Sequence, residues 1–441
     1  MKRYSEYKDS GVKWIGEIPG HWECTRIKFI ANLYGRIGFR GYNSKDLNKD
    51  GIGAITLSPS NMKDMMMDYT NVTYLSWEKY NESPEIMIQQ GDILFVKTGS
   101  SYGKSCYVDN LPQEATINPQ ILRINPLING RFLCYYFNSS LARTFTECGV
   151  VGGTIPTISQ EKVGNFIALN PPLPEQEAIV TYLDTKVAKI DEYISIAEKK
   201  IAALEELKQT IIAEAVTRGI HKDVPMKDSG VKWIGMIPEH WKIMRLRFVC
   251  EFRNGYTPSK ANPKFWENGT IPWFRMEDIR DSGRFLNEAK QYISKEAVKG
   301  DGLFEAGSFI LATTATIGEH AMLIADSLEN QRFTNLKIRK SLISKLSRNF
   351  FFYYLFVIDE YCKSTTRKAT FPSVDMTDLK NIGVSIPPIE EQQEIVTYLD
   401  SKVANINQLC QAERSQIEKL KEYKQRLISD VVTGKVKVTN D

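Results

Sequence analysis

The sequence lacks several features that would place it in common functional classes. It has no run of eighteen apolar residues, and the apolar stretch at 350–358 has the length of a core segment rather than a membrane span. Its first ten residues, MKRYSEYKDS, contain no apolar region of the kind found in signal peptides. These two observations predict a cytoplasmic protein.

Metal-ligand patterns are also missing. The seven cysteines stand singly, at 24, 106, 134, 148, 250, 362 and 410, without a CxxC motif, and the four histidines never pair with each other or with cysteine at ligand spacing. We therefore expect reduced, mostly buried thiols and neither a metal site nor a cofactor.

What is present is a long chain of ordinary globular composition. Its 441 residues are 42% hydrophobic and 25% charged, with a net charge of +4. A chain of this length and composition is typical of two to four folded units.

The main feature is an internal repeat. KDSGVKWIGEIPGHW at 8–22 returns at 227–241 as KDSGVKWIGMIPEHW, identical at 13 of 15 positions. PPLPEQEAIVTYLDTKVAKID at 171–191 matches 387–407 at 14 of 21 positions, and GDILF at 91–95 lies opposite GSFIL at 307–311. The segments between these flanks have diverged, so we expect a shared frame that carries two different recognition blocks.

After each Pro pair the frame predicts a long helix. Apolar residues recur at alternating steps of four and three from Leu183 to Ala215 and again from Leu399 to Val431. This is the a/d pattern of a coiled coil, and two matched seams in one chain favour pairing with each other over two separate amphipathic helices.

Connectivity predicts that the two helices run antiparallel, with a recognition block at each end of a rod and a pseudo-twofold axis between them. The blocks alternate strand-like segments with turns, and each contains a local helix candidate, at 130–145 and 347–364. The predicted fold class is therefore mixed α/β (α+β), with two such domains separated by two long antiparallel coiled-coil helices. The expected borders are 1–22 for the first signature, 23–165 for domain one, 166–218 for the central helical region, 219–241 for the second signature, 242–381 for domain two and 382–441 for the C-terminal helical region.

Charge is distributed unevenly between the blocks. Block one has 14 basic and 13 acidic residues, and block two has 22 and 16. A basic excess confined to the inserts is compatible with contacts to phosphate.

Four segments together resemble the DNA specificity subunit of type I restriction–modification systems. They are DSGVKWIGEIPGHW, PPLPEQEAIVTYLD, the junction AVTRGIHKDVPMKDSG and IPWFRMEDI, and the resemblance covers nearly the whole chain in the right order. The resemblance implies two target recognition domains, each contacting one half of a bipartite, asymmetric site in double-stranded DNA, with the helices as spacer. It also implies no catalytic activity of its own, and as partners two adenine-methylating modification subunits and, through them, ATP-dependent restriction subunits.

Three patterns suggest enzyme chemistry, and each is better explained by structure. GSSYGKS at 99–105 is one residue short of a phosphate-binding loop, so we expect a polar turn that faces DNA. NPPL at 170–173 is similar to an adenine methyltransferase motif, but it reads IPPI in the repeat, which favours a helix start. His21 and His240 lack a recurring nucleophile or carboxylate at catalytic spacing, so a packed imidazole is the better interpretation.

Side chains that contact bases should lie in the turns that end strands, because these turns stay polar in both copies while their residues differ. In block one the candidates are Tyr34, Arg36, Arg40, Lys97, Thr98, Ser100, Ser101, Tyr102 and Lys104. In block two they are Arg253, Tyr256, Lys260, Arg275, Thr313, Thr314, Thr316, Arg367, Lys368 and Thr370. Any one of them could instead be a solvated surface residue.

The alternative function is a coiled-coil scaffold whose paired domains bind proteins. Binding to duplex DNA that weakens with salt would distinguish the two, since an adaptor releases no counterions from phosphate.

Overall fold

The computed structural model describes residues 3–13, 15–48, 50–150, 155–281, 283–365 and 373–439. Contacts divide the chain into two compact units: unit 1 is Met1–Glu198 with Arg414–Asp441, and unit 2 is Lys199–Glu413. None of the described helices is both long enough and apolar enough to cross a membrane.

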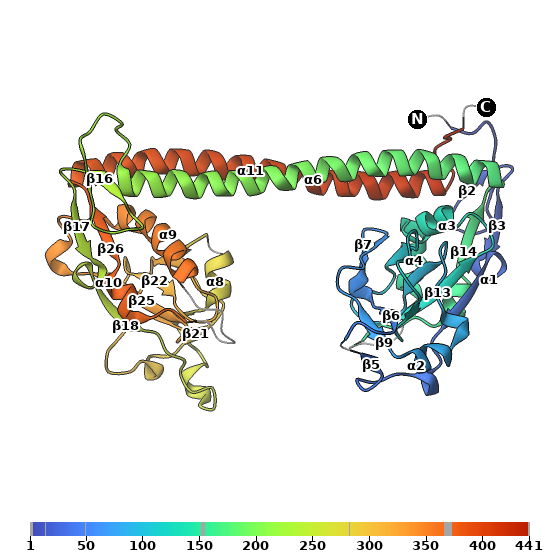
Figure 1. Ribbon diagram of the computed structural model, residues 1–441, viewed down its shortest axis with the longest axis horizontal. Helices are drawn as coiled ribbons and strands as arrows, with labels where there is room; N and C mark the ends of the chain where they lie inside the picture. Colours follow the sequence, from blue (N-terminus) through green and yellow to red (C-terminus); the bar gives the residue numbers. More distant parts are fainter. Residues whose placement is uncertain are drawn as a thin grey trace. The chain divides into compact units, whose positions relative to one another are not determined.

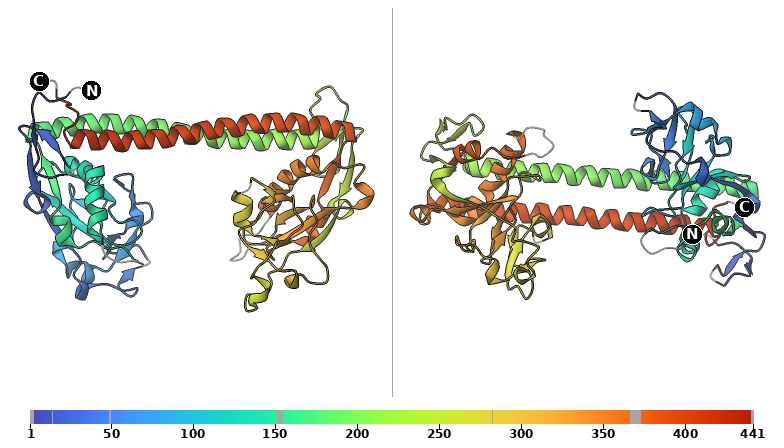
Figure 2. Two further views of the ribbon diagram at one scale, coloured as in Figure 1. Left: turned by 180° about the vertical axis from the view of Figure 1, so that it is seen from behind. Right: turned by 90° about the horizontal axis from the view of Figure 1, so that it is seen from below.

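Two long helices, α6 (Leu173–Arg218) and α11 (Ile389–Val432), each contribute a segment to both units. Within each unit the two segments lie side by side (Figures 1 and 2). In unit 1 the Lys424 ammonium lies 2.6 Å from Asp191 Oδ1, and in unit 2 Lys208 Nζ lies 3.2 Å from Asn407 Oδ1. Partner numbers fall on one helix as they rise on the other, so the predicted antiparallel pairing is confirmed.

The predicted seam is the buried side of both helices. Every seam position from Leu183 to Ala215 and from Leu399 to Val431 is buried or half-buried. In unit 1 Leu183, Val187 and Ile190 share a core with Leu427 and Val431. The heptad pattern therefore identified the packing surface correctly.

The remaining elements of unit 1 form a mixed α/β domain. A four-stranded sheet has the order β11-β10-β13-β4, a second has the order β12-β6-β9-β5, and β14 pairs with β3. The bounds are β3 (Glu23–Arg26), α1 (Ile27–Ile30), β4 (Ala31–Gly35), β5 (Leu47–Asn48), β6 (Ala54–Leu57), β7 (Met62–Lys63), β8 (Met66–Met67), β9 (Thr73–Leu75), α2 (Trp77–Asn81), β10 (Ile93–Val96), β11 (Ser105–Tyr107), β12 (Ala115–Ile117), β13 (Ile121–Pro126), α3 (Gly130–Phe137), α4 (Ser140–Gly149), α5 (Gln160–Gly164) and β14 (Ile167–Asn170).

Unit 2 repeats this plan. Its larger sheet has the order β18-β25-β22-β23-β20, a smaller one has the order β21-β19-β24, and β17 pairs with β26. The bounds are β17 (Lys242–Arg245), α7 (Leu246–Val249), β18 (Cys250–Asn254), β19 (Ile271–Phe274), α8 (Met276–Asp281), β20 (Phe285–Leu286), β21 (Tyr292–Ile293), β22 (Phe309–Ala312), β23 (His320–Leu323), β24 (Leu328–Glu329), β25 (Phe333–Ile338), α9 (Arg348–Thr365), α10 (Met376–Asn381) and β26 (Gly383–Ile386). The predicted fold class is confirmed for both units.

One predicted helix is wrong in detail. The segment 130–145 forms two helices, α3 and α4, because Ser139 begins the second as its N-cap and its hydroxyl accepts a hydrogen bond from Ala142 N at 3.3 Å. The corresponding segment of unit 2 is the single helix α9, as predicted. Helix α3 in unit 1 and helix α9 in unit 2 lie between the long helices and the sheet (Figure 1). Each contacts a long helix through a tyrosine: Tyr135 OH donates to Asp184 Oδ1 at 2.7 Å, and Tyr353 OH donates to Asp400 Oδ1 at 2.6 Å.

The repeated signature forms a small hairpin followed by a buried tryptophan. The hairpins are β1 (Tyr7–Asp9) with β2 (Glu17–Pro19), and β15 (Met226–Asp228) with β16 (Met236–Pro238). Trp22 and Trp241, which follow them, are fully buried.

Each tryptophan is bound to the first turn of a long helix. Trp22 Nε1 donates to Glu175 Oε2 at 3.0 Å, and His21 Nε2 lies 2.8 Å from the same oxygen. The repeat has the same contacts, since Trp241 Nε1 and His240 Nε2 lie 3.0 and 2.8 Å from Glu391 Oε2. The two histidines thus take part in a structural contact, but their side chains are 51% and 44% exposed rather than packed, and a carboxylate does recur beside them.

The same tryptophans pack against the end of the other helix. A Cβ placed on Gly219, which follows α6 with φ +80°, would lie 3.3 Å from Trp241. A Cβ on Gly434, beyond the end of α11 with φ +72°, would lie 2.5 Å from Pro19 and 3.1 Å from Trp22. The positive φ favours glycine at both sites, and at Gly434 a side chain would also clash with Pro19. We call this arrangement of signature Trp, helix-start Glu and helix-end Gly the joint.

The buried polar groups of the two units differ, although the repeated segments around the two domains agree. In unit 1 the buried Asp92 carboxylate accepts from Arg123 Nε at 2.6 Å. At the equivalent places unit 2 has Ser308 and Asn335, and Asn335 Nδ2 donates to Glu329 at 2.8 Å. Burial raises the pKa of Glu329 well above its ordinary value.

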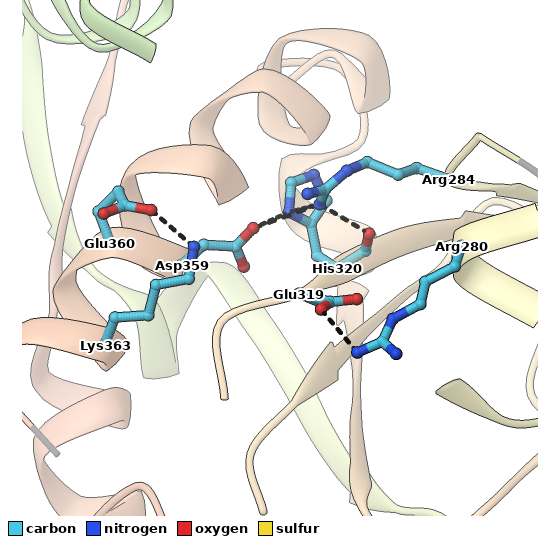
Figure 3. A network of polar contacts seen from close by, with 7 residues as sticks. All are labelled: Arg280, Arg284, Glu319, His320, Asp359, Glu360 and Lys363. Atoms are coloured by element: carbon cyan, nitrogen blue, oxygen red, sulfur yellow. Dashed lines mark hydrogen bonds and ion pairs between the residues drawn. The ribbon is translucent and has the colours of Figure 1, made fainter. Parts of the chain in front are cut away.

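A second polar network is enclosed in unit 2. His320 Nδ1 lies 2.6 Å from Asp359 Oδ2, and Arg284 Nη1 donates to that oxygen and to the His320 carbonyl at 3.3 and 3.1 Å (Figure 3). Phe352 and Phe356 cover the fully buried imidazole. Burial lowers the pKa of His320, outweighing the opposing effect of Asp359.

We expect Glu175→Ala to lower the free energy of unfolding of unit 1 by about 1–3 kcal/mol, because the buried indole N–H of Trp22 loses its acceptor. Glu177→Ala, at an exposed position of the same helix, is the matched control. Urea unfolding followed by tryptophan fluorescence measures the difference. Equal stability of the two variants would show that the joint contributes nothing.

We also expect unit 2 to lose stability in mild acid. Burial lowers the pKa of His320 in the folded protein, whereas the unfolded chain takes up a proton near the ordinary pKa of 6.5. The unfolded state therefore binds more protons below about pH 6.5, and stability falls there by up to roughly 1.4 kcal/mol per pH unit. Urea unfolding at pH 7.5 and 5.5 measures this fall, which should shrink in His320→Gln; a variant with the wild-type pH dependence would contradict the assignment to His320.

Candidate nucleic-acid interface

Three chain segments meet beyond the end of the central strand of each unit. In unit 1 the turn after β10 is held by hydrogen bonds from Lys97 N to Gln120 O at 2.8 Å and from Ile158 N to Lys97 O at 2.9 Å. In unit 2 Thr313 N donates to Arg332 O at 3.1 Å and Val374 N to Thr313 O at 2.9 Å. We call the region where these segments meet the edge of each unit. The two edges have the same pattern of backbone hydrogen bonds.

An isolated bridge confirms the equivalence of these edges. Thr98 pairs with Thr157, and Thr314 pairs with Ser373, both antiparallel and both 216 residues apart in the two copies. The alignment of the two blocks on GDILF and GSFIL is therefore correct in space.

The side chains on the unit 1 turn are polar and vary in accessibility. Ser100 and Ser101 are exposed, while Thr98, Tyr102 and Lys104 are half-buried. Burial lowers the pKa of Lys97, whose ammonium lies close to the backbone of Gly35. This turn offers two free hydroxyl-bearing side chains at its tip.

The unit 2 turn has a different set. Thr313 is buried and its hydroxyl lies 3.0 Å from that of Thr334, which fixes it inside the domain. Thr314 and Thr316 are half-buried on the outer part of the turn.

Most of the predicted DNA-contacting residues that precede these turns in the sequence contact other groups of the protein instead. Arg36 is only 6% exposed and donates to Thr116 Oγ1 at 3.0 Å and to Ile117 O, so it fastens the end of β4 to β12. The Tyr34 ring faces the Arg123 guanidinium at 5.6 Å, and Arg40 forms an ion pair with Glu85 at 3.5 Å. Tyr34 and Arg36 therefore serve packing.

The corresponding loops of unit 2 show the same division. Arg253 donates to Asp301 O at 2.6 Å and to Gly302 O at 2.8 Å, and Tyr256 OH donates to Ala297 O at 3.2 Å. Arg275 forms an ion pair with Glu277 at 2.8 Å, whereas Lys260 is exposed. Arg367, Lys368 and Thr370 lie outside the described residues.

The sequence analysis missed one segment of each edge. Gln120, exposed, and Asn118, half-buried, precede β13, and exposed Gln331 and Arg332 precede β25, where Arg332 lies 212 residues after Gln120. Their polar side chains directly before a strand were a usable signal. They lie beside the predicted turns because Gln120 O and Arg332 O hold those turns in place.

The chemistry of the two edges suits hydrogen bonding to bases and phosphates. Hydroxyl, amide and guanidinium groups are the donors and acceptors that contact base edges in DNA grooves. No group of His, Cys, Asp and Glu in the described part of the chain is arranged to hold a metal ion. GSSYGKS forms the hairpin between antiparallel β10 and β11, whereas a phosphate-binding loop leads from a strand into a helix.

Comparison with known proteins gives the same picture over nearly the whole chain. The family model for the type I restriction modification DNA specificity domain matches twice, at residues 21–206 and 238–419. The putative type I restriction enzyme MjaX specificity subunit of Methanocaldococcus jannaschii is 24% identical over 98% of both chains. The EcoprrI specificity subunit of Escherichia coli is 45% identical over 159 residues, which cover 34% of this chain and 40% of that protein.

The fold agrees as well. A solved chain from a study of complex assembly and conformational transition in the type I restriction–modification system has a TM-score of 0.68 at 19% identity, covering 95% of this chain and 99% of that one. With two matched specificity domains that span most of its length, this chain belongs to the type I restriction–modification DNA specificity family.

Proposed function

We propose that the chain is the DNA-recognition subunit of a type I restriction–modification complex. Residues 23–165 and 242–381 act as two recognition domains, each contacting one half of a bipartite, asymmetric duplex site. Residues 166–218 and 382–441 are the helical regions that set the gap, and the signatures at 1–22 and 219–241 attach the domains to them. The chain itself is not catalytic, and it acts in the cytoplasm.

One observation carries this proposal. The edges at 97–104 and 313–319 share their backbone hydrogen bonds but differ in side chains: Ser100 and Ser101 in one, Thr314 and Thr316 in the other. A shared backbone that carries different polar side chains suits two domains that recognise different DNA sequences. The proposed contacts are Lys97, Thr98, Ser100, Ser101, Tyr102, Lys104, Asn118 and Gln120 in unit 1, and Lys260, Thr314, Thr316, Gln331 and Arg332 in unit 2.

The long helices offer a surface for partner helices. Tyr193 and Tyr423 are 61% and 46% exposed in unit 1, and their equivalents in unit 2, Leu409 and Leu207, are 49% and 48% exposed. All four occupy the g position beside the seam, where antiparallel helices face each other. This supports the docking of one modification subunit on each unit, and through these the restriction subunits.

Exchange of one block is the direct test. Replacing 23–165 with the equivalent block of a relative should change the bases of one half-site and leave the other unchanged, because each domain has its own core. The measurement is a map of methylated sites in DNA from cells that express the chain with its modification subunit. Replacing 242–381 is the matched control and should change the other half only; a folded variant with both halves altered would contradict the two-reader proposal.

The spacer proposal predicts the effect of lengthening the helices. One heptad inserted in both helices, after Lys199 and after Glu413, adds about 10 Å of helix, which is roughly three base pairs. Both half-sites should persist with a longer gap. The same heptad in α6 alone cannot keep Asp191 with Lys424 and Lys208 with Asn407 at once, so modification should be lost.

Mapping methylated sites for the double and the single insertion decides between these outcomes. An unchanged gap in the double variant, or a fully active single variant, would show that the helices are not the ruler. Insertion beside Gly219 is unsuitable, since that residue packs against Trp241 within the joint.

A further inference from the structure

A one-turn helix in each unit exposes a phenylalanine to solvent. Phe29 on α1 is 65% exposed and Phe248 on α7 is 53% exposed. A neighbouring cation lies over each ring: Lys28 Nζ is 5.4 Å from the Phe29 centroid, and the Arg247 guanidinium is 4.9 Å from that of Phe248.

The two helices sit in identical settings. The sequence of buried and exposed positions from 21 to 31 is the same as that from 240 to 250. Burial explains the apolar residues on the inner side, Ile27 and Ile30 in one copy and Leu246 and Val249 in the other.

Packing does not explain the exposed residues that persist. Arg26 and Arg245 are both exposed, as are the cation and the phenylalanine that follow them. Exposed positions on either side have changed: Glu23 corresponds to Lys242, and Asn32 to Glu251. We call the retained set, Arg26, Lys28 and Phe29 in unit 1 and Arg245, Arg247 and Phe248 in unit 2, the cation–Phe patch.

We propose that the cation–Phe patch is a docking surface for the modification subunit, present once in each unit. The inference rests on the proposed function, in which the chain holds two copies of the same modification subunit. Surfaces that contact the bases of two different half-sites must differ between the units, whereas surfaces that hold two copies of one partner must agree, and an exposed phenylalanine suits a protein partner better than DNA phosphate. The patch belongs to the second kind, and it gives each modification subunit an anchor on the recognition domain in addition to the long helices.

The chemistry of the patch defines the surface that fits it. A phenylalanine more than half exposed gains from an apolar pocket, and aromatic and arginine side chains are the usual anchors of protein interfaces. In the described part of the chain no carboxylate forms an ion pair with the four cations of the two patches. The partner surface is therefore an apolar pocket bordered by acidic residues.

The test is the stoichiometry and affinity of the complex between the full chain and its modification subunit, measured by native mass spectrometry and titration calorimetry. Wild type should bind two copies. Phe29→Ala and Phe248→Ala should each weaken one of the two sites by roughly 10- to 100-fold, which corresponds to losing one buried aromatic ring. The double variant should weaken both, and Lys28→Glu and Arg247→Glu should act in the same direction.

Matched controls separate the patch from exposure as such. Met66→Ala in unit 1 and Ile324→Ala in unit 2 remove apolar side chains that are 66% and 48% exposed and are not repeated between the units. Both should bind two copies with wild-type affinity.

Three results would overturn the inference. Wild-type affinity in the folded double variant would remove the patch from the interface. Unchanged subunit binding with weaker DNA binding by the assembled complex would assign the patch to nucleic acid instead. A wild-type chain that binds no modification subunit would refute the proposed function as well as this inference.

Discussion

The structure depends on a single shared acceptor in each unit. One carboxylate oxygen, at the first turn of a long helix, meets both the indole N–H of a buried tryptophan and a histidine ring: Trp22 and His21 at Glu175, Trp241 and His240 at Glu391. The tryptophan also packs on the glycine that follows the opposite helix. The start of one helix, the end of the other and the entry into a domain are thereby fixed by the same few atoms.

This constraint explains why the chain repeats some segments and varies others. Residues of the joint cannot change independently, because a donor without its acceptor in a buried site is costly. The cores of the two units can differ as long as every buried polar group has a partner within its own core. Unit 1 encloses the Asp92–Arg123 ion pair, while unit 2 has Ser308 and Asn335 at the same places and carries the His320–Asp359–Arg284 network elsewhere (Figure 3).

The sequence predicted those parts of the structure that follow from periodicity and repetition. The seam from Leu183 to Ala215 and the equivalence of the two edges could be derived from spacing and repetition, and the antiparallel orientation of the two helices from connectivity. Non-local packing could not. The burial of Arg36 follows from the parallel pairing of β6 with β12, which brings Thr116 and Ile117 within reach of its guanidinium, and no local pattern encodes that pairing. The break between α3 and α4 depends on a single N-cap at Ser139.

The division of the chain has a consequence for how it is made. Unit 2 is one continuous segment, Lys199–Glu413, whereas unit 1 joins the first 198 residues to Arg414–Asp441. Synthesis from the N-terminus therefore completes unit 2 while unit 1 still lacks Leu427, Ile428 and Val431, which cover Leu183 and Val187. The apolar side of the first half of α6 therefore lacks its contacts with α11 until Leu427, Ile428 and Val431 have been made. The domain that begins first is therefore completed last, and premature termination within α11 removes the α11 side of the core that Leu183 and Val187 share with it, while the two other cores of unit 1 remain.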